Sequence, residues 1–267
     1  MKSIQVGGHE ICSIDRGEGP PLLLVHGFPL DHSMWTAQID RFSGRCRVLA
    51  PDLPGFGRSP AVADKVGMEQ FADILAGLLD AVQVAEPVVF CGLSMGGYIA
   101  FQFWRRHRSR LRGLVLCDTR ATADSPEAAR ARLAAAEQVL REGPAALAES
   151  MLGKLFSETT RRQRPELVEA TRAVILGSDH RGLAAAARGM AERPRMTGEL
   201  PEIDCPTLIV VGEQDAISSP VEMCRLAQVM PRAAFVTIRA AAHLAPLEDP
   251  AEVNAALGAF LATLWEA

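Results

Sequence analysis

Short apolar runs along the chain alternate with longer segments in which apolar residues recur every three or four positions. The short runs are almost continuously apolar, which is typical of strands that are buried on both faces of a parallel sheet. The predicted strands are Leu22–Val25, Arg47–Ala50, Val88–Cys91, Gly113–Cys117, Thr207–Val211 and Ala234–Ile238. Because strand and helix patterns alternate, the sequence predicts a mostly parallel α/β sheet with helices on both faces.

The segments between these strands show helical periodicity, and two of them begin with a proline, which suits the first turn of a helix. The predicted helices are His32–Phe42, Met68–Val82, Met95–His107, Pro220–Met230 and Pro250–Trp265. Two earlier segments, Ser3–Val6 and Glu10–Asp15, are separated by Gly7-Gly8. This arrangement predicts a β-hairpin on the edge of the sheet.

One long stretch interrupts the alternation of strands and helices. Between about residues 120 and 200 there is no strand-like run, and Ala, Arg, Glu, Leu and Met recur at helical spacing. We therefore predict a helical cap over residues 120–200, inserted in an α/β core that comprises residues 1–119 and 201–267. Segments inserted at the carboxyl ends of parallel strands overhang the ligand-binding crevice, which favours a cap. An ordinary set of surface helices is the alternative.

Composition excludes several classes of partner. The chain has 267 residues and a formal net charge of -4, so it lacks the broad basic field of a nucleic-acid-binding protein. It shows neither an apolar signal run nor a stretch that approaches the roughly 18 to 20 apolar residues of a membrane helix. We therefore expect a cytoplasmic protein with no nucleic-acid or membrane partner. The six widely spaced cysteines favour reduced thiols over a disulfide framework.

The sharpest chemical signal is Gly92-Leu93-Ser94-Met95-Gly96, which joins a predicted strand to a predicted helix. A tight turn at this place exposes the serine hydroxyl, and small flanking residues allow the backbone to approach its neighbours closely. The turn also places Ser94 at a helix N-terminus, where free N–H groups favour developing negative charge. Ser94 is therefore a candidate nucleophile, and a purely structural glycine turn is the alternative.

A serine hydroxyl needs a base to become a good nucleophile, and a group to orient that base. Among the six histidines, His243 lies in a small-residue loop after the last predicted strand, where this architecture presents catalytic groups. Asp215 follows the preceding strand, which gives the chain order Ser94, Asp215, His243. Asp118 also lies at a strand end and competes for the acid's place, whereas Glu213 is closer to its strand and is expected to face away.

Acyl transfer also needs hydrogen-bond donors for the oxygen that becomes negatively charged. The sequence His26-Gly27-Phe28-Pro29 follows a predicted strand, so the N–H of Phe28 can point into the same crevice as the N–H of Met95. Pro29 has no N–H to donate. We expect His26 to brace this loop by hydrogen bonds instead of serving as a second base.

With these motifs in order along the chain, the sequence resembles the α/β-hydrolase superfamily, and within it the group of small serine esterases, lactonases and perhydrolases. The motifs are His26-Gly27-Phe28-Pro29, Asp52-Leu53-Pro54-Gly55-Phe56-Gly57-Arg58-Ser59, Gly92-Leu93-Ser94-Met95-Gly96-Gly97, Gly212-Glu213-Gln214-Asp215 and Ala242-His243-Leu244-Ala245-Pro246-Leu247-Glu248-Asp249-Pro250. The resemblance implies a roughly eight-stranded sheet, a cap over an acyl pocket, and neither a cofactor nor a metal. Dehalogenases differ, because their nucleophile is an aspartate at the place of Ser94.

The apolar pocket expected under the cap has several candidate wall residues. They are Leu30, Trp35, Met151, Leu155, Phe156 and Met190. Ordinary core packing explains these residues equally well.

The favoured interpretation is a serine hydrolase that cleaves a carboxylic ester of a small or medium acyl substrate through an acyl-enzyme. Lactone opening, perhydrolysis and carbon–carbon bond hydrolysis use the same catalytic groups and stay open as alternatives. A non-catalytic protein that binds a small ligand is a hypothesis of another class, which the joint presence of serine, acid and histidine disfavours. The sequence does not determine the oligomeric state.

Overall fold

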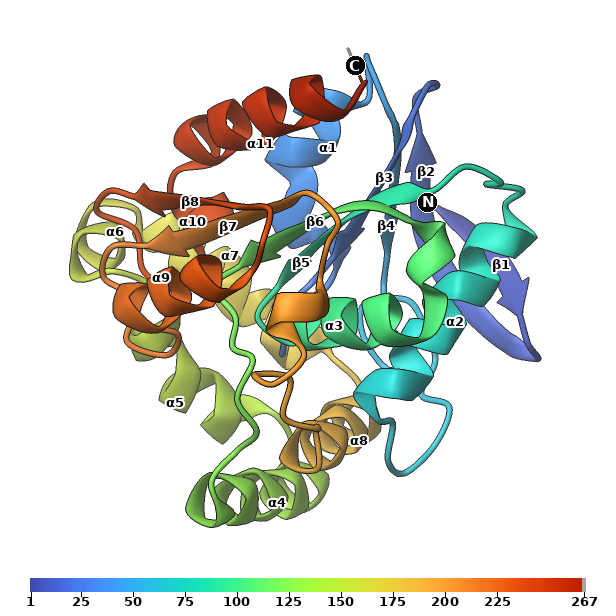
Figure 1. The fold of residues 1–267 in the computed structure, drawn as a ribbon. Helices are drawn as coiled ribbons and strands as arrows, with labels where there is room; N and C mark the ends of the chain where they lie inside the picture. The colour runs from blue at the N-terminus through green and yellow to red at the C-terminus, as the bar shows by residue number, and fades with distance from the viewer. Residues whose placement is uncertain (266–267) are drawn as a thin grey trace.

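Residues 1–265 of the chain, described by a computed structural model, form one eight-stranded sheet with the strand order β1-β2-β4-β3-β5-β6-β7-β8 (Figure 1). The strands are β1 (Lys2–Val6), β2 (His9–Arg16), β3 (Pro21–Val25), β4 (Arg47–Pro51), β5 (Val88–Leu93), β6 (Leu111–Cys117), β7 (Thr207–Gly212) and β8 (Ala233–Ile238). Strand β2 pairs antiparallel with β1 and β4, and all other neighbours are parallel. The α/β class and the edge hairpin predicted from the sequence are confirmed.

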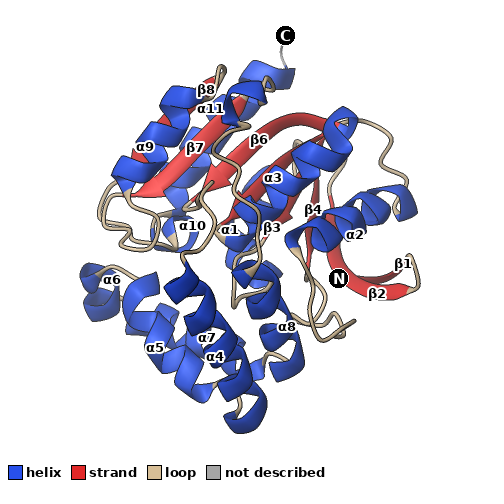
Figure 2. Cartoon of the chain, turned by 60° about the horizontal axis from the view of Figure 1, so that its bottom comes forward, coloured by secondary structure: helices blue, strands red, loops and turns tan. Residues whose placement is uncertain are grey.

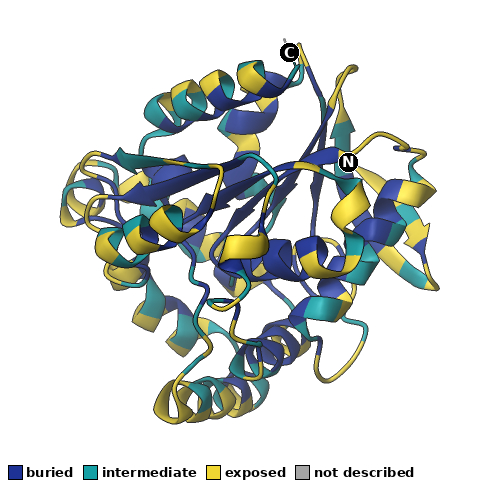
Figure 3. Ribbon diagram, in the orientation of Figure 1, coloured by how far each residue is buried: buried dark blue, intermediate teal, exposed yellow. Residues whose placement is uncertain are grey.

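Helices cover both faces of this sheet, and its central strands are buried between them (Figure 3). The helices outside the segment between β6 and β7 are α1 (Thr36–Phe42), α2 (Met68–Ala81), α3 (Met95–His107), α9 (Pro220–Val229), α10 (Ala245–Glu248) and α11 (Pro250–Trp265). Short 3-10 turns are η1 (His32–Trp35), η2 (Arg108–Arg110) and η3 (Leu200–Glu202). Within residues 1–265, no helix has the length and apolar character needed to span a bilayer.

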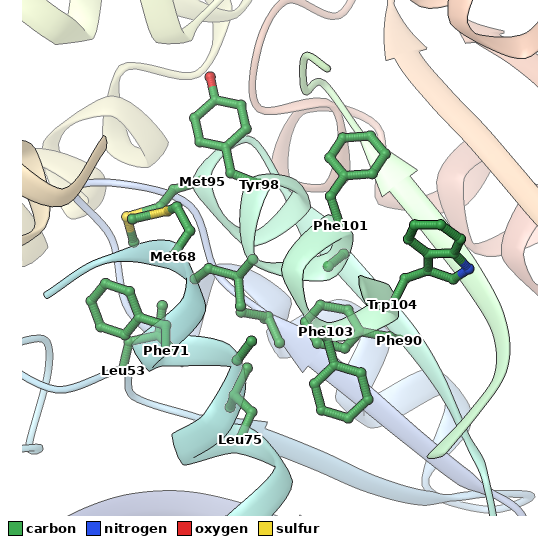
Figure 4. Close-up of a cluster of buried hydrophobic side chains, with 14 of the residues drawn as sticks. Leu53, Met68, Phe71, Leu75, Phe90, Met95, Tyr98, Phe101, Phe103 and Trp104 are labelled. Carbon is green, nitrogen blue, oxygen red and sulfur yellow. The ribbon is translucent and has the colours of Figure 1, made fainter. Parts of the chain in front are cut away.

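Each face of the sheet has its own hydrophobic core, because successive side chains of a strand point to opposite faces. On β3, Leu23 and Val25 pack with residues of α2, α3 and α9, whereas Leu22 and Leu24 pack with residues of α1 and α11. Figure 4 shows the first of these cores, where side chains of α2, α3 and β5 meet. The continuous apolar runs in the sequence therefore reflect burial on both faces.

The predicted helix His32–Phe42 is two elements in the structure, the 3-10 turn η1 and the helix α1. The side chain of Asp31 caps the turn by accepting a hydrogen bond from the N–H of Ser33 at 2.9 Å. Asp52, from the loop after β4, accepts a hydrogen bond from the N–H of His32 at 3.0 Å. These two carboxylates hold the first turn in the tighter conformation, which periodicity alone does not reveal.

Five helices lie between β6 and β7, and Figure 2 shows them gathered beyond one end of the sheet. They are α4 (Pro126–Glu142), α5 (Ala145–Leu155), α6 (Glu158–Gln163), α7 (Pro165–Gly177) and α8 (His180–Ala191). Phe28, which follows the carboxyl end of β3, packs against Ala136 of α4 and Ala184 of α8. Helices α4 and α8 therefore lie at the carboxyl end of β3.

Helix α8 contacts the loops after β4 through a face of glycines. Gly182 and Gly189 are seven positions apart and lie on the same side of the helix. A Cβ atom on Gly182 would overlap the backbone of Gly55, and one on Gly189 would overlap the backbone oxygen of Val66. Val66 donates a hydrogen bond from its N–H to the backbone oxygen of Ala185 at 3.2 Å. This direct contact of backbone with backbone fixes the distance between α8 and the loops after β4.

We expect Gly182→Ala to lower the free energy of unfolding by about 1–3 kcal/mol, because the added methyl group must push α8 away from Gly55. Gly153→Ala in α5 is the matched control, since the added Cβ would have no atom within 4 Å apart from its chain neighbours and the backbone of its own helix. This control should gain about 0.5–1 kcal/mol from its better helix propensity. Thermal unfolding of both variants measures the difference, and equal melting temperatures would contradict the tight contact.

Candidate active site

Ser94 lies in a strained turn between β5 and α3. Its backbone has a φ of 53° and a ψ of -109°, in a region where a residue with a Cβ costs of order 1–3 kcal/mol. Glycine is required on both sides, because a Cβ on Gly92 would overlap Gly96 and a Cβ on Gly96 would overlap the backbone oxygen of Val25. The N–H of Ser94 donates to the backbone oxygen of Cys117 at 2.9 Å, which holds the turn against β6.

The structure brings Ser94, His243 and Asp215 together in one hydrogen-bonded line. The Nε2 atom of His243 lies 2.9 Å from the Oγ atom of Ser94, and its Nδ1 atom lies 2.9 Å from the Oδ2 atom of Asp215. All three side chains are buried. A carboxylate only accepts hydrogen bonds, so Nδ1 carries the proton in the neutral imidazole and Nε2 accepts from the serine hydroxyl.

The second oxygen of Asp215 is held by backbone donors. Its Oδ1 atom accepts hydrogen bonds from the N–H groups of Ile217 at 2.7 Å and Ser218 at 3.0 Å. These bonds fix the plane of the carboxylate, so that Oδ2 points at the imidazole of His243.

Asp118, the competing acid, lies at the end of β6 and forms no hydrogen bond with His243 among the described residues. Its Oδ1 atom accepts from the N–H of Gly212 at 2.8 Å, and its Oδ2 atom has no partner within residues 1–265. Complete burial, together with the nearby charge of Asp215, raises the pKa of Asp118 well above its ordinary value. The two neighbouring acids thus have different environments, and only Asp215 faces the imidazole.

Glu248 holds the loop that carries His243, a connection that the sequence analysis missed. Its Oε1 atom accepts from the N–H of Ala242 at 2.6 Å, and its Oε2 atom accepts from the N–H of Ser157 at 2.9 Å. The N–H of Leu244 also donates to the backbone oxygen of Leu155 at 3.1 Å. The sequence contained Glu248 within a family motif but gave no sign that it bonds backbone groups on both sides of the site.

The loop after β3 lies directly beside Ser94. A Cβ on Gly27 would lie 3.3 Å from the Cβ of Ser94, so the backbone preceding Phe28 passes next to the serine. Within residues 1–265, no backbone acceptor is assigned to the N–H of Phe28 or to that of Met95. Both amides are therefore candidate donors to a substrate oxygen at Ser94.

His26 braces this loop, as the sequence analysis expected. Its Nε2 atom accepts from the N–H of Leu53 at 3.0 Å, so its Nδ1 atom carries the proton and donates to the backbone oxygen of Gly27 at 3.1 Å. Burial lowers the pKa of His26, which keeps the ring neutral.

One group of three metal-ligand residue types lies close together within the described part of the chain, namely Asp31, His32 and Asp52. The Oδ1 atom of Asp52 lies 2.7 Å from the Nδ1 of His32, and its Oδ2 atom accepts from the N–H of Arg58 at 2.9 Å. Burial alone would raise the pKa of Asp52, but the hydrogen bonds from His32 and from backbone N–H groups lower it. These contacts indicate that Asp31, His32 and Asp52 stabilise the loop after β4.

The six candidate pocket residues lie in different parts of the structure. Met151 lines a cavity of about 310 Å³ between α4, α5, α8 and Phe28, and Leu30 lines one of about 220 Å³ beside α7. The other four are buried in the hydrophobic cores, namely Trp35, Leu155, Phe156 and Met190. The structure therefore does not bring the six residues together around one cavity.

Comparison with known proteins agrees with this geometry. Residues 22–256 match the model of the alpha/beta hydrolase family. The chain belongs to the α/β-hydrolase family. Membership of this family supports a hydrolase activity on a small molecule.

Individual relatives differ in the reaction that their names state. A solved structure of a thermophilic esterase from Thermogutta terrifontis, with malate bound, is 47% identical, has a TM-score of 0.96 and matches over 98% of both chains. The 3-oxoadipate enol-lactonase 1 of Acinetobacter baylyi is 26% identical over 93% of this chain and 88% of the relative. A haloalkane dehalogenase of Sphingobium indicum is 27% identical over 98% of this chain and 95% of the relative.

We expect Glu248→Gln to lower the free energy of unfolding by about 1–3 kcal/mol, because an amide NH2 group would face a buried N–H donor. The same change should lower kcat, since it loosens the loop that positions His243. Thermal unfolding and ester turnover measure the two effects. Glu18→Gln, at an exposed loop residue, is the control. A Glu248→Gln enzyme as stable and active as this control would show that the carboxylate does not hold the loop.

Proposed function

We propose that the chain is a serine hydrolase that cleaves a carboxylic ester of a small or medium acyl substrate through an acyl-enzyme. The observation that carries this proposal is the line of hydrogen bonds from Asp215 through His243 to Ser94, with 2.9 Å at both imidazole contacts. Two amides without an assigned backbone acceptor, those of Phe28 and Met95, lie beside the same serine. Nucleophile, base, orienting acid and oxyanion donors are the groups that acyl transfer requires.

In the acylation step, Ser94 Oγ attacks the carbonyl carbon while His243 Nε2 takes the hydroxyl proton. The carbonyl oxygen becomes an oxyanion and accepts hydrogen bonds from the N–H groups of Phe28 and Met95. Asp215 stabilises the imidazolium that forms. The intermediate then expels the alcohol, whose oxygen receives the proton from His243, and the acyl group stays on Ser94.

In the deacylation step, a water molecule takes the alcohol's place. His243 removes one of its protons as the water oxygen attacks the acyl carbon, and the same two amides hold the second oxyanion. Breaking the bond to Ser94 Oγ releases a carboxylic acid, and the serine recovers its proton from His243.

The helices between β6 and β7 act as the cap in this proposal, with residues 120–200 inserted in a core of residues 1–119 and 201–267. Two contacts support this role: Ser157 and Leu155 bond the loop that carries His243, and Phe28 packs against α4 and α8. Ser94 is only 9% exposed. In this proposal the substrate enters between cap and core, and burial of the site strengthens the electrostatic interactions there.

Lactone opening is the second candidate reaction, and the enol-lactonases among the relatives favour it. The same groups would act, but the leaving oxygen would stay attached to the acyl chain. Perhydrolysis and carbon–carbon bond hydrolysis also use this set of residues. Dehalogenation fits less well, because displacement at a carbon–halogen bond requires a carboxylate nucleophile where this chain has Ser94.

We expect Ser94→Ala to lower kcat for short p-nitrophenyl esters by roughly 10³-fold or more, because no other group can form the acyl-enzyme. Ser13→Ala, at a buried serine of β2, is the matched control and should keep its activity. A fluorophosphonate probe should label the unmodified enzyme at Ser94. Equal turnover by the two variants would remove Ser94 from the mechanism. A folded protein that resists labelling would favour the non-catalytic binding protein.

A second experiment distinguishes the roles of the two buried acids, Asp215 and Asp118. Asp215→Asn should lower kcat by about 10²–10⁴-fold, because the imidazole loses the acceptor that fixes its tautomer. Asp118→Asn should keep kcat close to that of the unmodified enzyme, since its side chain does not face His243. A larger loss of kcat in Asp118→Asn than in Asp215→Asn would transfer the orienting role to Asp118.

The free energy of unfolding at different pH values gives an independent test of the protonation state of Asp118. Because burial raises its pKa in the folded chain, the folded state holds this proton more tightly than the unfolded state does. The resulting stabilisation is complete below the ordinary carboxyl pKa and is lost as the pH rises through the raised value. The free energy of unfolding of Asp118→Asn should therefore fall less than that of the unmodified chain between about pH 5 and about pH 8 in urea titrations. Parallel curves would show that Asp118 is ionised in the fold.

A further inference from the structure

The cavity of about 310 Å³ between α4, α5 and α8 combines an apolar wall with two cations. Its apolar wall includes Phe28, Val139, Met151 and Leu183, and its charged lining residues are Arg132 and Lys154. No aspartate or glutamate of the described residues lines it. Its volume is at the lower end of the range of roughly 300–1,000 Å³ for small-molecule sites.

Positive charge at this cavity exceeds the negative charge around it. Asp124 accepts from Arg132 Nε at 2.6 Å, and it also lies 2.7 Å from a terminal nitrogen of Arg193. One carboxylate therefore serves two guanidinium groups, which leaves one positive charge in excess. Within residues 1–265, no acceptor is assigned to the ammonium of Lys154 or to the Nη2 atom of Arg132.

The nearby acids of the same helices do not cancel this charge, because each is engaged elsewhere. On α4, Glu137 pairs with Arg188 at 2.6 Å, Glu127 with Arg130 at 3.1 Å and Glu142 with Arg141 at 3.9 Å. On α5, Glu149 pairs with Arg172. The fixed positive charge at the cavity therefore attracts an anion, and the apolar wall favours a hydrocarbon segment beside it.

Phe28 connects this cavity with the proposed reaction site. Phe28 lines the cavity, and its backbone follows Gly27, which passes beside Ser94. We infer that a substrate whose carbonyl group lies at Ser94 extends an apolar chain past Phe28 toward Arg132 and Lys154.

We propose that the cavity binds a carboxylate at the far end of the acyl chain, so that the preferred substrates are half-esters of dicarboxylic acids or lactones that carry a carboxylate. This inference rests on the proposed ester hydrolysis. The apolar wall holds the chain, while Arg132, anchored by Asp124, and Lys154 bind the carboxylate.

Kinetics with matched esters test the inference. The substrates are p-nitrophenyl half-esters of succinic, adipic and suberic acid, each compared with the neutral butanoate, hexanoate or octanoate of the same chain length. We expect a higher kcat/KM for the charged member of at least one pair. High salt should reduce this preference, because it screens the charges of the exposed Lys154 and the half-buried Arg132.

Lys154→Gln should raise KM for the preferred half-ester by about fivefold, with little change in kcat, because one charge interaction is lost from binding. Lys154→Gln combined with Arg132→Gln should remove the preference for the charged ester. Lys65→Gln is the matched control, since it removes an exposed lysine that pairs with Glu192. Equal kcat/KM values within every pair, or equal effects of Lys154→Gln and Lys65→Gln, would overturn the inference while ester hydrolysis stands.

A binding measurement separates the two proposals if neither kind of ester is hydrolysed. That result would refute the proposed function. Adipate should still raise the melting temperature of the unmodified protein. Lys154→Gln should reduce this shift, Lys154→Gln combined with Arg132→Gln should abolish it, and Lys65→Gln should keep it. Absence of any shift with succinate, adipate and suberate would then refute the anion site as well.

Discussion

The close approach of backbone segments at the carboxyl ends of β3, β5, β6 and β7 is the constraint on which the site depends. Ser94 adopts a positive φ, and Gly92 and Gly96 leave no room for a Cβ. The turn is tied to β6 through the backbone of Cys117. A parallel sheet makes this possible, because its strands end at the same edge and deliver side chains from distant parts of the sequence to one place.

The loop that carries His243 is also held in place by contacts with the helices between β6 and β7. Glu248 bonds the backbone of Ala242 and of Ser157 with its two carboxylate oxygens. On the other side, Gly182 lets α8 touch the backbone of Gly55. The helices thus contact the core at both flanks of the site, and we infer that their position affects the geometry at His243 and the cavity beside Phe28.

Asp215 and Asp118 are two buried carboxyl groups at adjacent strand ends, and their different surroundings give them different roles. Asp215 has backbone donors on one oxygen and an imidazole on the other. Asp118 has a single donor and is completely buried, which raises its pKa and favours its neutral form. A neutral acid beside Asp215 adds no negative charge that would compete for the imidazolium formed during the proposed reaction.

The sequence by itself determined the α/β class, the edge hairpin and the order of strands and helices, because these depend on local periodicity and on the turn preferences of glycine and proline. It also singled out Ser94, Asp215 and His243, since each follows a strand that ends at the same edge. Only the tertiary structure decided that His243 faces Asp215 and not Asp118, because both acids follow strand ends and their surroundings depend on distant segments. It also decided the bonds of Glu248 and the cavity with Arg132 and Lys154, which join segments far apart in the sequence and leave no local pattern.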